Sequence, residues 1–534
     1  MAEYTPFLRR APTRDSLPDA LATKQQPSRR DPRNYASLCR FLTYPIWRFL
    51  HQGKAWLQCN LLNPGKRRSR GRSRIHILLV RLVKATIISS FFFAFISILE
   101  GIIYPSYQHP PKHYETLRDK ITSFSHSGRG NEHNEKIFIA ANIVNERLIR
   151  GSWGDALLEL VGILGEENVF VSIFENDSGP GTSAVLNELR ARLPCNSSIV
   201  TGARLPLSQF PAVTLPNGER RIKRIAYLAE VRNRALRPLD PSYTPKDDAT
   251  EFRHAPIKFR RVLFLNDVYF TPLDVAQLLF STNAAPNRRA SYRAACAIDF
   301  GSPGKIYDTF VMRDVEGYRI GTPFFPWFPT QGEATSRRDV LAEKDAVRVR
   351  SCWGGVAAFD ASVFQRLTNK DTYELSIQFR YDPEPFWEAA ECCLVFADME
   401  QRLGVPEAKN GTGVFVNPYV RVAYSQATWK WIQFFRRYER VWRNFQYIAS
   451  TVAYSKDNPR RSHKPGQWVK QKIWVSDIQK PRRGVFKVVE RRAPAGGFCG
   501  ERRMFVMQKD IEGANKSGRG KNWDEVWPNF RRER

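Results

Sequence analysis

One uninterrupted apolar segment constrains this 534-residue chain more than any other feature. Ala85 to Tyr104 has the sequence ATIISSFFFAFISILEGIIY and carries a single charge, Glu100, near its far end. A helix of about 20 apolar residues crosses a bilayer core of about 30 Å, whereas apolar helices that fill a protein core are usually shorter. The segment therefore predicts one N-terminal transmembrane helix, with the chain on either side folding separately.

The charges that flank this segment predict its orientation. The chain has a formal net charge of +30, and residues 1–84 alone hold eighteen Lys/Arg against four Asp/Glu, a net +14. The basic run Lys66 to Arg74, KRRSRGRSR, lies shortly before the apolar segment. By the positive-inside rule this flank stays cytoplasmic, and the chain after Tyr104 is luminal or extracellular. We therefore interpret the basic excess as a topology signal and expect no nucleic-acid partner.

The cysteines divide between the two sides of the predicted membrane helix. Cys39 and Cys59 precede it, and the other six follow it. An oxidising lumen permits disulfides among those six. A bond that joins Cys352 to Cys392 or to Cys393 is one interpretation, although spacing alone does not fix the pairing.

Composition divides the chain into further segments. Residues 1–84 are expected to form a basic cytoplasmic tail that is largely disordered, because they are polar and contain several prolines. Residues 105–135 are rich in Pro, Tyr and polar side chains and are expected to form a stem. Residues 136–424 are predicted to be a luminal domain. Residues 425–534 form a basic, aromatic C-terminal extension, predicted to be disordered at its end.

The segment 136–424 alternates between short apolar runs typical of buried strands and longer stretches with helical spacing. Such alternation predicts an α/β domain, with a mostly parallel sheet flanked by helices. Strands are expected at 136–144, 168–177, 197–202, 261–267 and 293–300, and helices at 152–164, 181–193, 220–239, 272–280 and 390–404.

Acidic residues follow three of the expected strands. NVFVSIFEND contains Glu175 and Asp177 at its end, RVLFLND ends in Asp267, and RAACAIDF contains Asp299. Because ligands bind outside the carboxyl ends of parallel strands, these carboxylates are expected at one sheet edge. Mg²⁺ and Mn²⁺ prefer such oxygen ligands, often one or two carboxylates together with phosphate oxygens. A lone strand-end Asp is also a common turn or cap residue, and for Asp267 both interpretations stay open.

Other candidates lie close to these acids in the predicted order of elements. Arg232 and Asn233 precede the Asp267 strand on a helix, where a guanidinium can neutralise phosphate or organise a carboxylate. Asn266, Trp353 and Gly354 join them as candidate ligand-binding residues. The chain has neither a Gly-x-Gly-x-x-Gly after the first strand nor a Walker A sequence, which disfavours hydride transfer and P-loop hydrolysis.

An ordered set of short stretches resembles the fungal glycosyltransferase family 69, the cryptococcal α-1,3-mannosyltransferase and capsule-associated protein family. The resemblance covers roughly residues 136 to 424. The stretches are AANIVNE (140–146), VFVSIFENDSGPGT (169–182), LAEVRNRAL (228–236), VLFLNDVYF (262–270), ACAIDF (295–300), YDTFVMRDVEG (307–317), SCWGGVAAFD (351–360) and AECCL (390–394).

This resemblance implies a GT-A-like fold and a type II Golgi membrane enzyme. It implies transfer of mannose from GDP-mannose to a mannoside acceptor, with an α-1,3 linkage, retention at the anomeric carbon and a divalent cation, Mn²⁺ or Mg²⁺. By position Asp267 corresponds to the metal-linked acid, although here the triplet is Asn-Asp-Val with a single Asp. Either Glu391 or Asp314 is expected to act on the sugar or the acceptor, and the sequence leaves that choice open.

Two other classes of protein remain as alternatives. A luminal metal-dependent phosphoester hydrolase needs two close metals, usually with His ligands, and none of the eight His residues flanks the acidic strand ends. A non-catalytic scaffold of the secretory pathway could keep a glycosyltransferase-like fold without the chemistry, an interpretation that the presence of Asp267 disfavours.

Overall fold

The structure is a computed structural model of the whole chain. It describes residues 72–176, 178, 180–203, 205–215, 218–240, 257–285, 289–367, 373–404, 412–453, 458–476, 484–508 and 523–527. The predicted disorder of the N-terminal tail, Cys39, Cys59 and Asp177 lie outside these residues. The contacts divide the chain into two compact units, with the boundary between Ile96 and Ser97.

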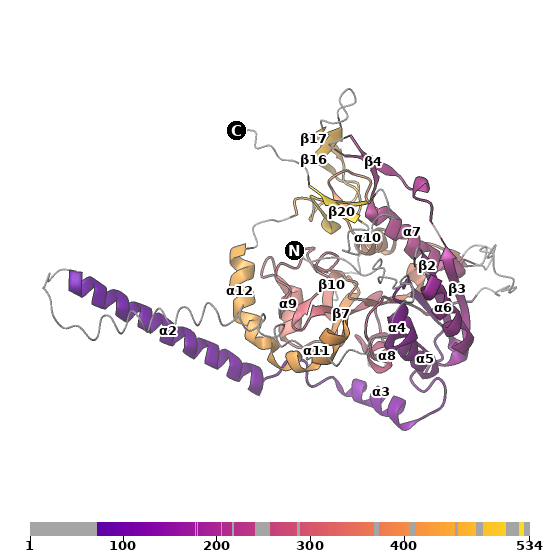
Figure 1. Cartoon of the computed structure of the whole chain (residues 1–534), viewed down its shortest axis with the longest axis horizontal. Helices are drawn as coiled ribbons and strands as arrows, with labels where there is room; N and C mark the ends of the chain where they lie inside the picture. The colour runs from indigo at the N-terminus through magenta and orange to yellow at the C-terminus, as the bar shows by residue number, and fades with distance from the viewer. Residues whose placement is uncertain are drawn as a thin grey trace, which may run out of the picture. The chain divides into compact units, whose positions relative to one another are not determined.

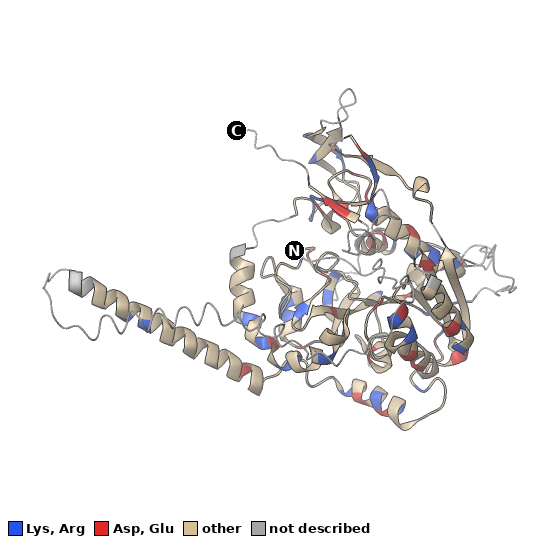
Figure 2. Ribbon diagram, in the orientation of Figure 1, with Lys and Arg blue, Asp and Glu red and all other residues tan. Residues whose placement is uncertain are grey.

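The long apolar helix predicted near the N-terminus is present as α2 (Arg72–Ile103). Within it, His76–Ile103 is the one stretch among the described residues that is long and apolar enough to cross a membrane. Figure 2 shows that α2 carries few charged residues along its length. The helix is therefore compatible with a single-pass anchor, and it begins earlier than the predicted residues 85–104.

A ten-stranded sheet forms the centre of the folded domain, with strand order β3-β2-β1-β6-β11-β7-β15-β10-β9 and β8 paired with β7 (Figure 1). Strands β3, β2, β1 and β6 pair in parallel, and so do β7 and β15. Strand β11 runs antiparallel to both of its neighbours, so β6 and β7 point the same way. The bounds are β1 Ile137–Ala141, β2 Val169–Asn176, β3 Asn196–Ala203, β6 Arg261–Leu265, β7 Ala294–Ser302, β8 Lys305–Ile306, β9 Arg313–Asp314, β10 Val347–Ser351, β11 Val356–Asp360 and β15 Val414–Ala423.

Helices cover both faces of this sheet, as the near-continuous apolar strands predict. One face packs against α4 (Glu146–Arg150), α5 (Ser152–Leu164), α6 (Pro180–Arg192) and α8 (Pro272–Ser281). The other packs against α7 (Arg224–Leu236) and α10 (Glu391–Leu403). Successive β1 residues alternate between the two cores, since Phe138 belongs to one and Ile139 to the other. The α/β class with a mostly parallel sheet flanked by helices is thus confirmed.

The segment predicted as a stem belongs largely to the folded domain. It contains α3 (Lys112–Ser123), which lies against α8. Tyr107 and Tyr114 are fully buried, and their rings lie 4.9 and 5.6 Å from that of Tyr419. Aromatic side chains in a Pro-rich stretch therefore anchor the chain here, and the folded domain begins well before residue 136.

The C-terminal extension is also folded over most of its described length. After α9 (Thr335–Leu341) and α10, the chain forms α11 (Gln426–Tyr438) and α12 (Trp442–Ala453). The last twenty residues, where disorder was predicted, contain strand β20. This strand is ordered because it pairs with β19 and buries Trp523. The small antiparallel sheets are β4 Ala212–Thr214 with β5 Arg220–Ile222, β12 Gln365–Leu367 with β13 Tyr373–Leu375, β14 Glu388–Ala389 with β18 Gly500–Glu501, β16 Trp468–Ser476 with β17 Gly484–Arg492, and β19 Met504–Met507 with β20 Trp523–Val526.

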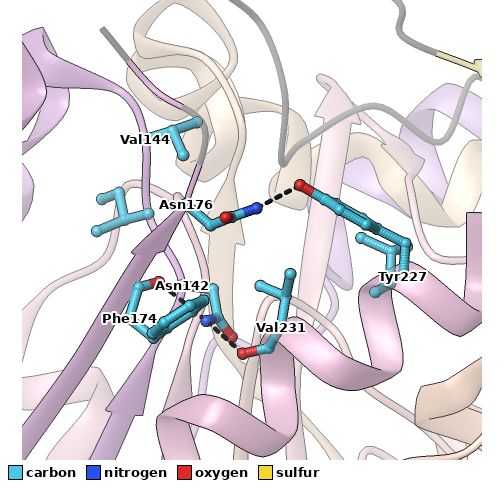
Figure 3. A pocket seen from close by; sticks show the side chains of 8 residues that line it. Asn142, Val144, Phe174, Asn176, Tyr227 and Val231 are labelled. Atoms are coloured by element: carbon cyan, nitrogen blue, oxygen red, sulfur yellow. Dashed lines mark hydrogen bonds between the residues drawn. The ribbon is translucent and has the colours of Figure 1, made fainter. Parts of the chain in front are cut away.

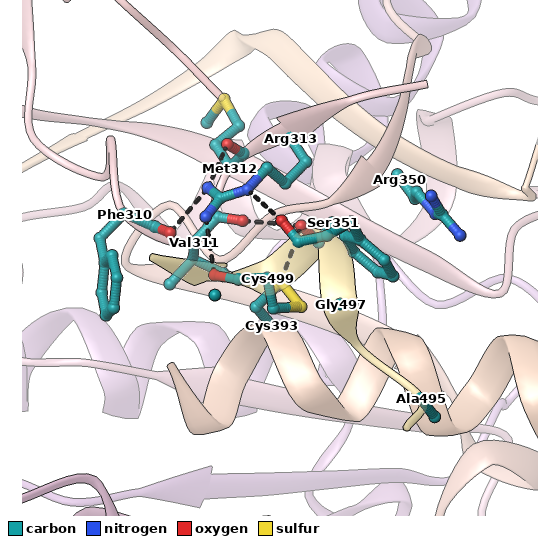
Figure 4. Close-up of a disulfide and its surroundings, with 12 residues drawn as sticks. Phe310, Val311, Met312, Arg313, Arg350, Ser351, Cys393, Ala495, Gly497 and Cys499 are labelled. Atoms are coloured by element: carbon teal, nitrogen blue, oxygen red, sulfur yellow. Dashed lines mark hydrogen bonds between the residues drawn. A yellow bond between two sulfur atoms is a disulfide. The ribbon is translucent and has the colours of Figure 1, made fainter. Parts of the chain in front are cut away.

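Two disulfides connect distant parts of the chain, Cys296–Cys352 and Cys393–Cys499. The predicted bond between Cys352 and Cys392 or Cys393 is wrong, because β7 and the turn before β11 are neighbours and bring Cys296 to Cys352. Figure 4 shows the second disulfide joining α10 to the C-terminal segment. Beside it, Arg313 donates hydrogen bonds to the carbonyl oxygens of Phe498 and Cys499 at 2.9 and 2.8 Å.

Candidate active site

The parallel strands bring several polar residues to one edge of the sheet. Strands β1, β2, β6 and β7 all point toward this edge, so Asn142, Glu175, Asn266 and Asp267 follow or end their strands there. Asp299 approaches the same edge within β7 and is fully buried. The predicted gathering of acidic strand ends therefore agrees with the strand directions.

Asp267 stands directly beyond the end of β6, on a backbone that is held firmly in place. The amide of Asn266 donates to the Gly355 carbonyl at 3.0 Å, and the Trp153 indole donates to the Asn266 carbonyl at 2.9 Å. The Asp267 residue is half-buried, and its Oδ1 is fully buried with no hydrogen-bond partner among the described residues. Burial raises the Asp267 pKa well above its ordinary value, and Arg232 lowers it. A carboxylate oxygen without a partner does not act as a turn cap.

A buried ion pair lies beside this acid. Arg232 on α7 donates from Nε to Glu391 Oε1 at 2.8 Å, and the two side chains are 3% and 0% exposed. The Arg232 guanidinium also lies over the Trp353 ring, 4.5 Å from its centroid. The Trp353 indole donates to Asn266 Oδ1 at 3.3 Å. Four predicted site residues are therefore linked to one another next to Asp267.

Two further acids lie close together behind the turn that precedes β11. Asp299 accepts from the Asp308 amide and from the Tyr424 hydroxyl, both at 3.0 Å. Asp308 accepts from the Val311 amide at 2.9 Å and from the Gly354 amide at 3.4 Å. Burial raises the pKa of both carboxyls, and the charge of Asp308 raises the Asp299 pKa further. This pair fixes the loop that carries Gly354.

The conformation of Gly354 explains why a glycine stands there. It has φ +56°, and an added Cβ would lie 1.9 Å from the Ala297 carbonyl oxygen. Only a residue without a side chain allows β7 and this turn to approach so closely. Gly354 thus shapes the site through its backbone.

Three other predicted residues, Glu175, Asn233 and Asp177, lie apart from this cluster or outside the described chain. Glu175 accepts from the amides of Ser178 and Gly202 at 2.9 and 2.6 Å, so its carboxylate stabilises the loops after β2 and β3. The Asn233 amide exchanges two hydrogen bonds with the Phe379 backbone, at 2.9 and 2.7 Å. The polar atoms of Glu175 and Asn233 that were expected to bind a ligand therefore bind the protein backbone instead. Asp177 is outside the described residues.

Asp314 occupies a different part of the fold from Glu391. It lies in β9, at the far end of the sheet order, and accepts from the Tyr318 amide at 2.7 Å. Burial, with a smaller contribution from the neighbouring Glu316, raises its pKa to about 7. No hydrogen bond among the described residues joins Asp314 to the cluster around Asp267.

A small pocket at the ends of β1 and β2 adds residues that the sequence did not single out. Asn142, Phe174, Asn176, Tyr227 and Val231 line it, together with neighbouring side chains (Figure 3). Asn142 donates to the carbonyls of Phe174 and Val231 at 3.1 and 3.0 Å, and its Oδ1 is buried without a partner in the described chain. The signal in the sequence was an Asn placed directly after a buried strand, the same pattern as Asn266.

The residues fit a divalent cation that takes one carboxylate from the protein and its other ligands from elsewhere. The described residues contain no group of three or more His, Cys, Asp or Glu that could hold a metal ion. Asp267 instead offers one carboxylate oxygen that is buried and has no partner in the described part of the chain. Mg²⁺ commonly takes one or two carboxylates and completes its shell with waters and substrate phosphates. A cation held jointly by Asp267 and a diphosphate agrees with this donor set.

The fold and the strand-edge cluster define an α/β domain with a candidate ligand site at the carboxyl ends of its parallel strands. Residues 136–398 match the family model described as cryptococcal mannosyltransferase 1. This match confirms the resemblance inferred from the short stretches and identifies the domain as a glycosyltransferase. The match favours the transferase over the hydrolase and the scaffold. No curated protein matches the chain in sequence.

Several solved structures are similar to the chain. The Pyrobaculum calidifontis mannosyltransferase PcManGT in complex with GDP-Man and Mn²⁺ is 11% identical, over 65% of this chain and 84% of that one, with a TM-score of 0.29. Glucosyl-3-phosphoglycerate synthase from Mycobacterium tuberculosis, with Mn²⁺ and UDP-glucose, is 12% identical over 72% and 93% (TM-score 0.29). Mannosyl-3-phosphoglycerate synthase from Rubrobacter xylanophilus is 12% identical over 71% and 96% (TM-score 0.26). The family assignment rests on the sequence match and not on these scores.

Proposed function

We propose that this glycosyltransferase moves mannose from GDP-mannose to a mannoside acceptor, with retention, an α-1,3 linkage and a divalent cation, Mn²⁺ or Mg²⁺. One observation carries the proposal. The strand-end residue Asp267 has a buried Oδ1 that lacks a hydrogen-bond partner among the described residues, and it stands at the sheet edge where parallel strands bind ligands. The match to a mannosyltransferase family supports mannose as the transferred sugar.

The reaction breaks the bond between the anomeric carbon and the diphosphate and joins that carbon to an acceptor hydroxyl, whose proton is released. When bound, the cation supplies Lewis-acid neutralisation of the diphosphate. Asp267 holds the cation, and Asn266 keeps Asp267 in position through its backbone bonds to the turn before β11. Arg232 contributes positive charge close to Asp267, although most of it is balanced by Glu391.

Glu391 is the better supported of the two candidate acids for action on the sugar. It begins α10 next to Arg232 and Trp353, and its Oε2 is buried without a partner within the described residues. The free oxygen can stabilise positive charge at the anomeric carbon or accept the acceptor proton. Asp314 lies at the far end of the sheet and keeps its carboxylate on the Tyr318 amide.

The nucleoside is expected at the ends of β1 and β2. There Asn142 presents an unused buried oxygen beside Asn176, whose side-chain amide donates to the Tyr227 hydroxyl (Figure 3). These groups suit hydrogen bonds to a base or a ribose. Glu175 and Asn233 then act by holding the surrounding loops, and Asp177, Asp299, Trp353 and Gly354 remain proposed members of the nucleotide-sugar site.

The enzyme is further proposed to be a type II protein of the Golgi or another secretory-pathway membrane, with its N-terminus cytoplasmic. The apolar stretch His76–Ile103 and the basic run before it support this orientation. Protease treatment of sealed microsomes checks it, because residues 105–534 are expected to be protected and the N-terminal tail cleaved.

The catalytic proposal is tested by GDP release from the full-length protein in detergent, with GDP-mannose, a panel of mannosides, and Mn²⁺ or EDTA. Asp267→Asn is expected to lower the rate by more than about 100-fold, since loss of the cation's support costs several kcal/mol. Asp360→Asn is the matched control, because Asp360 also ends a buried strand but at the opposite sheet edge. Equal rates for Asp267→Asn and wild type would overturn the proposed role, and activity with other nucleotide sugars alone would overturn the donor.

A further inference from the structure

An aromatic stripe runs along the solvent side of α11. Trp431, Phe434, Phe435 and Tyr438 follow one another at spacings that place them on one helix face. The Phe434 ring centroid lies 5.7, 5.8 and 5.1 Å from those of Trp431, Phe435 and Tyr438. The first three side chains are 55%, 49% and 38% exposed. We name these four residues the aromatic stripe.

The other two sides of α11 have different characters. Thr428 and Ile432 are buried, and Ile432 belongs to the domain core. Lys430 and Arg437 are exposed and lie seven residues apart, hence together along one side of the aromatic stripe. The helix is therefore anchored to the core by one side and presents aromatic and basic sides outward. A contiguous exposed apolar patch of this kind marks an interaction surface.

The following helix continues the exposed apolar surface. On α12, Phe445, Tyr447 and Ile448 are 54%, 56% and 60% exposed. Gln446 and Ser450, by contrast, are fully buried. Helix α12 thus keeps these two polar residues inside and large apolar ones outside, the reverse of a helix that faces water.

The end of α11 is attached to the chain immediately after the apolar helix. Helix α2 ends at Ile103, and the Ser106 hydroxyl donates to the Arg436 carbonyl at 3.3 Å and to the Glu439 carboxylate. Tyr107 is fully buried and donates to the Val340 carbonyl at 3.1 Å. Three extended residues reach at most about 11 Å. The point where a membrane span would end is therefore held close to the start of this exposed surface.

We propose that the aromatic stripe, with the exposed apolar side chains of α12, rests in the interface of a phospholipid bilayer, and that Lys430 and Arg437 lie against anionic headgroups. Aromatic rings favour the headgroup level, and basic side chains beside an apolar face strengthen binding to anionic lipid. A membrane is favoured over a protein partner because the short attachment to α2 keeps this surface close to the bilayer that α2 would cross. The domain is then held at two points, which limits its rotation on the membrane surface.

The test uses the full-length chain reconstituted in vesicles of phosphatidylcholine with a minor share of phosphatidylserine. A phospholipid with a photoactivatable diazirine near its glycerol backbone labels side chains at that depth, and mass spectrometry locates the adducts. We expect adducts on α11 in addition to α2. They should be lost in Trp431→Ser/Phe434→Ser/Phe435→Ser, whose thermal midpoint should stay that of wild type because these side chains are exposed.

The hairpin β16–β17 provides an internal control. It exposes Trp468, Val485 and Val488 by 62%, 51% and 66%, yet no hydrogen bond or ion pair of the described residues joins it to the chain at the end of α2. Labelling of α11 no stronger than that of this hairpin would overturn the proposal, as would a stable dimer in which α11 takes up no lipid. A second variant, Lys430→Gln/Arg437→Gln, should reduce labelling with phosphatidylserine but match wild type in phosphatidylcholine alone. If the variant and wild type are labelled equally in the vesicles that contain phosphatidylserine, the proposed contact of Lys430 and Arg437 with anionic headgroups is wrong.

Discussion

Replacing Arg232 with Met removes the positive partner of the buried ion pair and leaves the Glu391 carboxylate unpaired. The two charged atoms lie 2.8 Å apart, and the side chains are 3% and 0% exposed. At an effective dielectric constant of about 20, this distance corresponds to roughly 6 kcal/mol of attraction. Desolvation of both ions opposes that gain, so the expected loss of unfolding free energy is about 3–5 kcal/mol, the usual cost of leaving a buried charge unpaired.

Urea unfolding of the full-length protein in detergent, followed by tryptophan fluorescence, measures this loss. The double variant Arg232→Met/Glu391→Leu should regain most of it, because a buried apolar pair of similar volume is often no less stable than the ions. The surface pair Arg192–Asp155 is the control, with a similar 2.9 Å distance but side chains 51% and 63% exposed. Arg192→Met should cost less than about 1 kcal/mol. If Arg232→Met costs no more than this control, the ion pair is not desolvated as the structure describes.

Three further predictions concern the disulfide, the tight turn and a buried acid. Cys499→Ser opens a bond between residues 106 apart and should cost about 2–5 kcal/mol, visible as a lower thermal midpoint under non-reducing conditions; an unchanged midpoint would contradict the bond. Gly354→Ala should impair folding or GDP release, because its Cβ would lie 1.9 Å from a carbonyl oxygen of β7. Gly404→Ala meets no atom within 4 Å among the described residues and should cost only the backbone strain of a non-glycine residue at φ 69°, about 1–3 kcal/mol. Burial raises the Asp314 pKa from 3.8 to about 7, so the native state binds the proton more tightly and wild-type stability should fall as pH rises between about 4 and 7. In Asp314→Asn that slope should be shallower, and an identical slope would show that Asp314 does not titrate in this range.

Local patterns in the sequence were sufficient for most elements of the sheet and its helices. The helix expected at 152–164 is α5 with the same bounds, and the strand before Asp267 ends at Leu265. The helix expected from residue 220 starts only at Arg224, since residues 220–222 pair with β4. Pairing in this short hairpin overrode the local helical spacing there. Periodicity also gives no strand order, so it did not reveal that β11 inserts between β6 and β7.

The same distinction applies to the candidate site. Asp267 was predicted because it follows a buried strand, which is a local signal. The ion pair of Arg232 with Glu391 joins residues 159 apart and follows only from the packing of α7 and α10. Glu175 illustrates the converse, because a strand-end acid was predicted to bind ligand whereas its oxygens accept amides of its own loops. Strand-end positions therefore identified the candidate residues. Only the three-dimensional contacts showed which of their polar atoms already have hydrogen-bond partners.

The bond between α10 and the C-terminal segment has a consequence for how the protein is made. The chain is synthesised from its N-terminus, so Cys393 and the helix that carries Glu391 emerge long before Cys499. Strand β18, which pairs with β14, comes later still, and so does β19, whose Phe505 amide donates to the buried Glu388 carboxylate. The region around α10 cannot be completed during most of translation. A chain that ends before Cys499 would accordingly lack the disulfide and the strand that complete the region around Glu391.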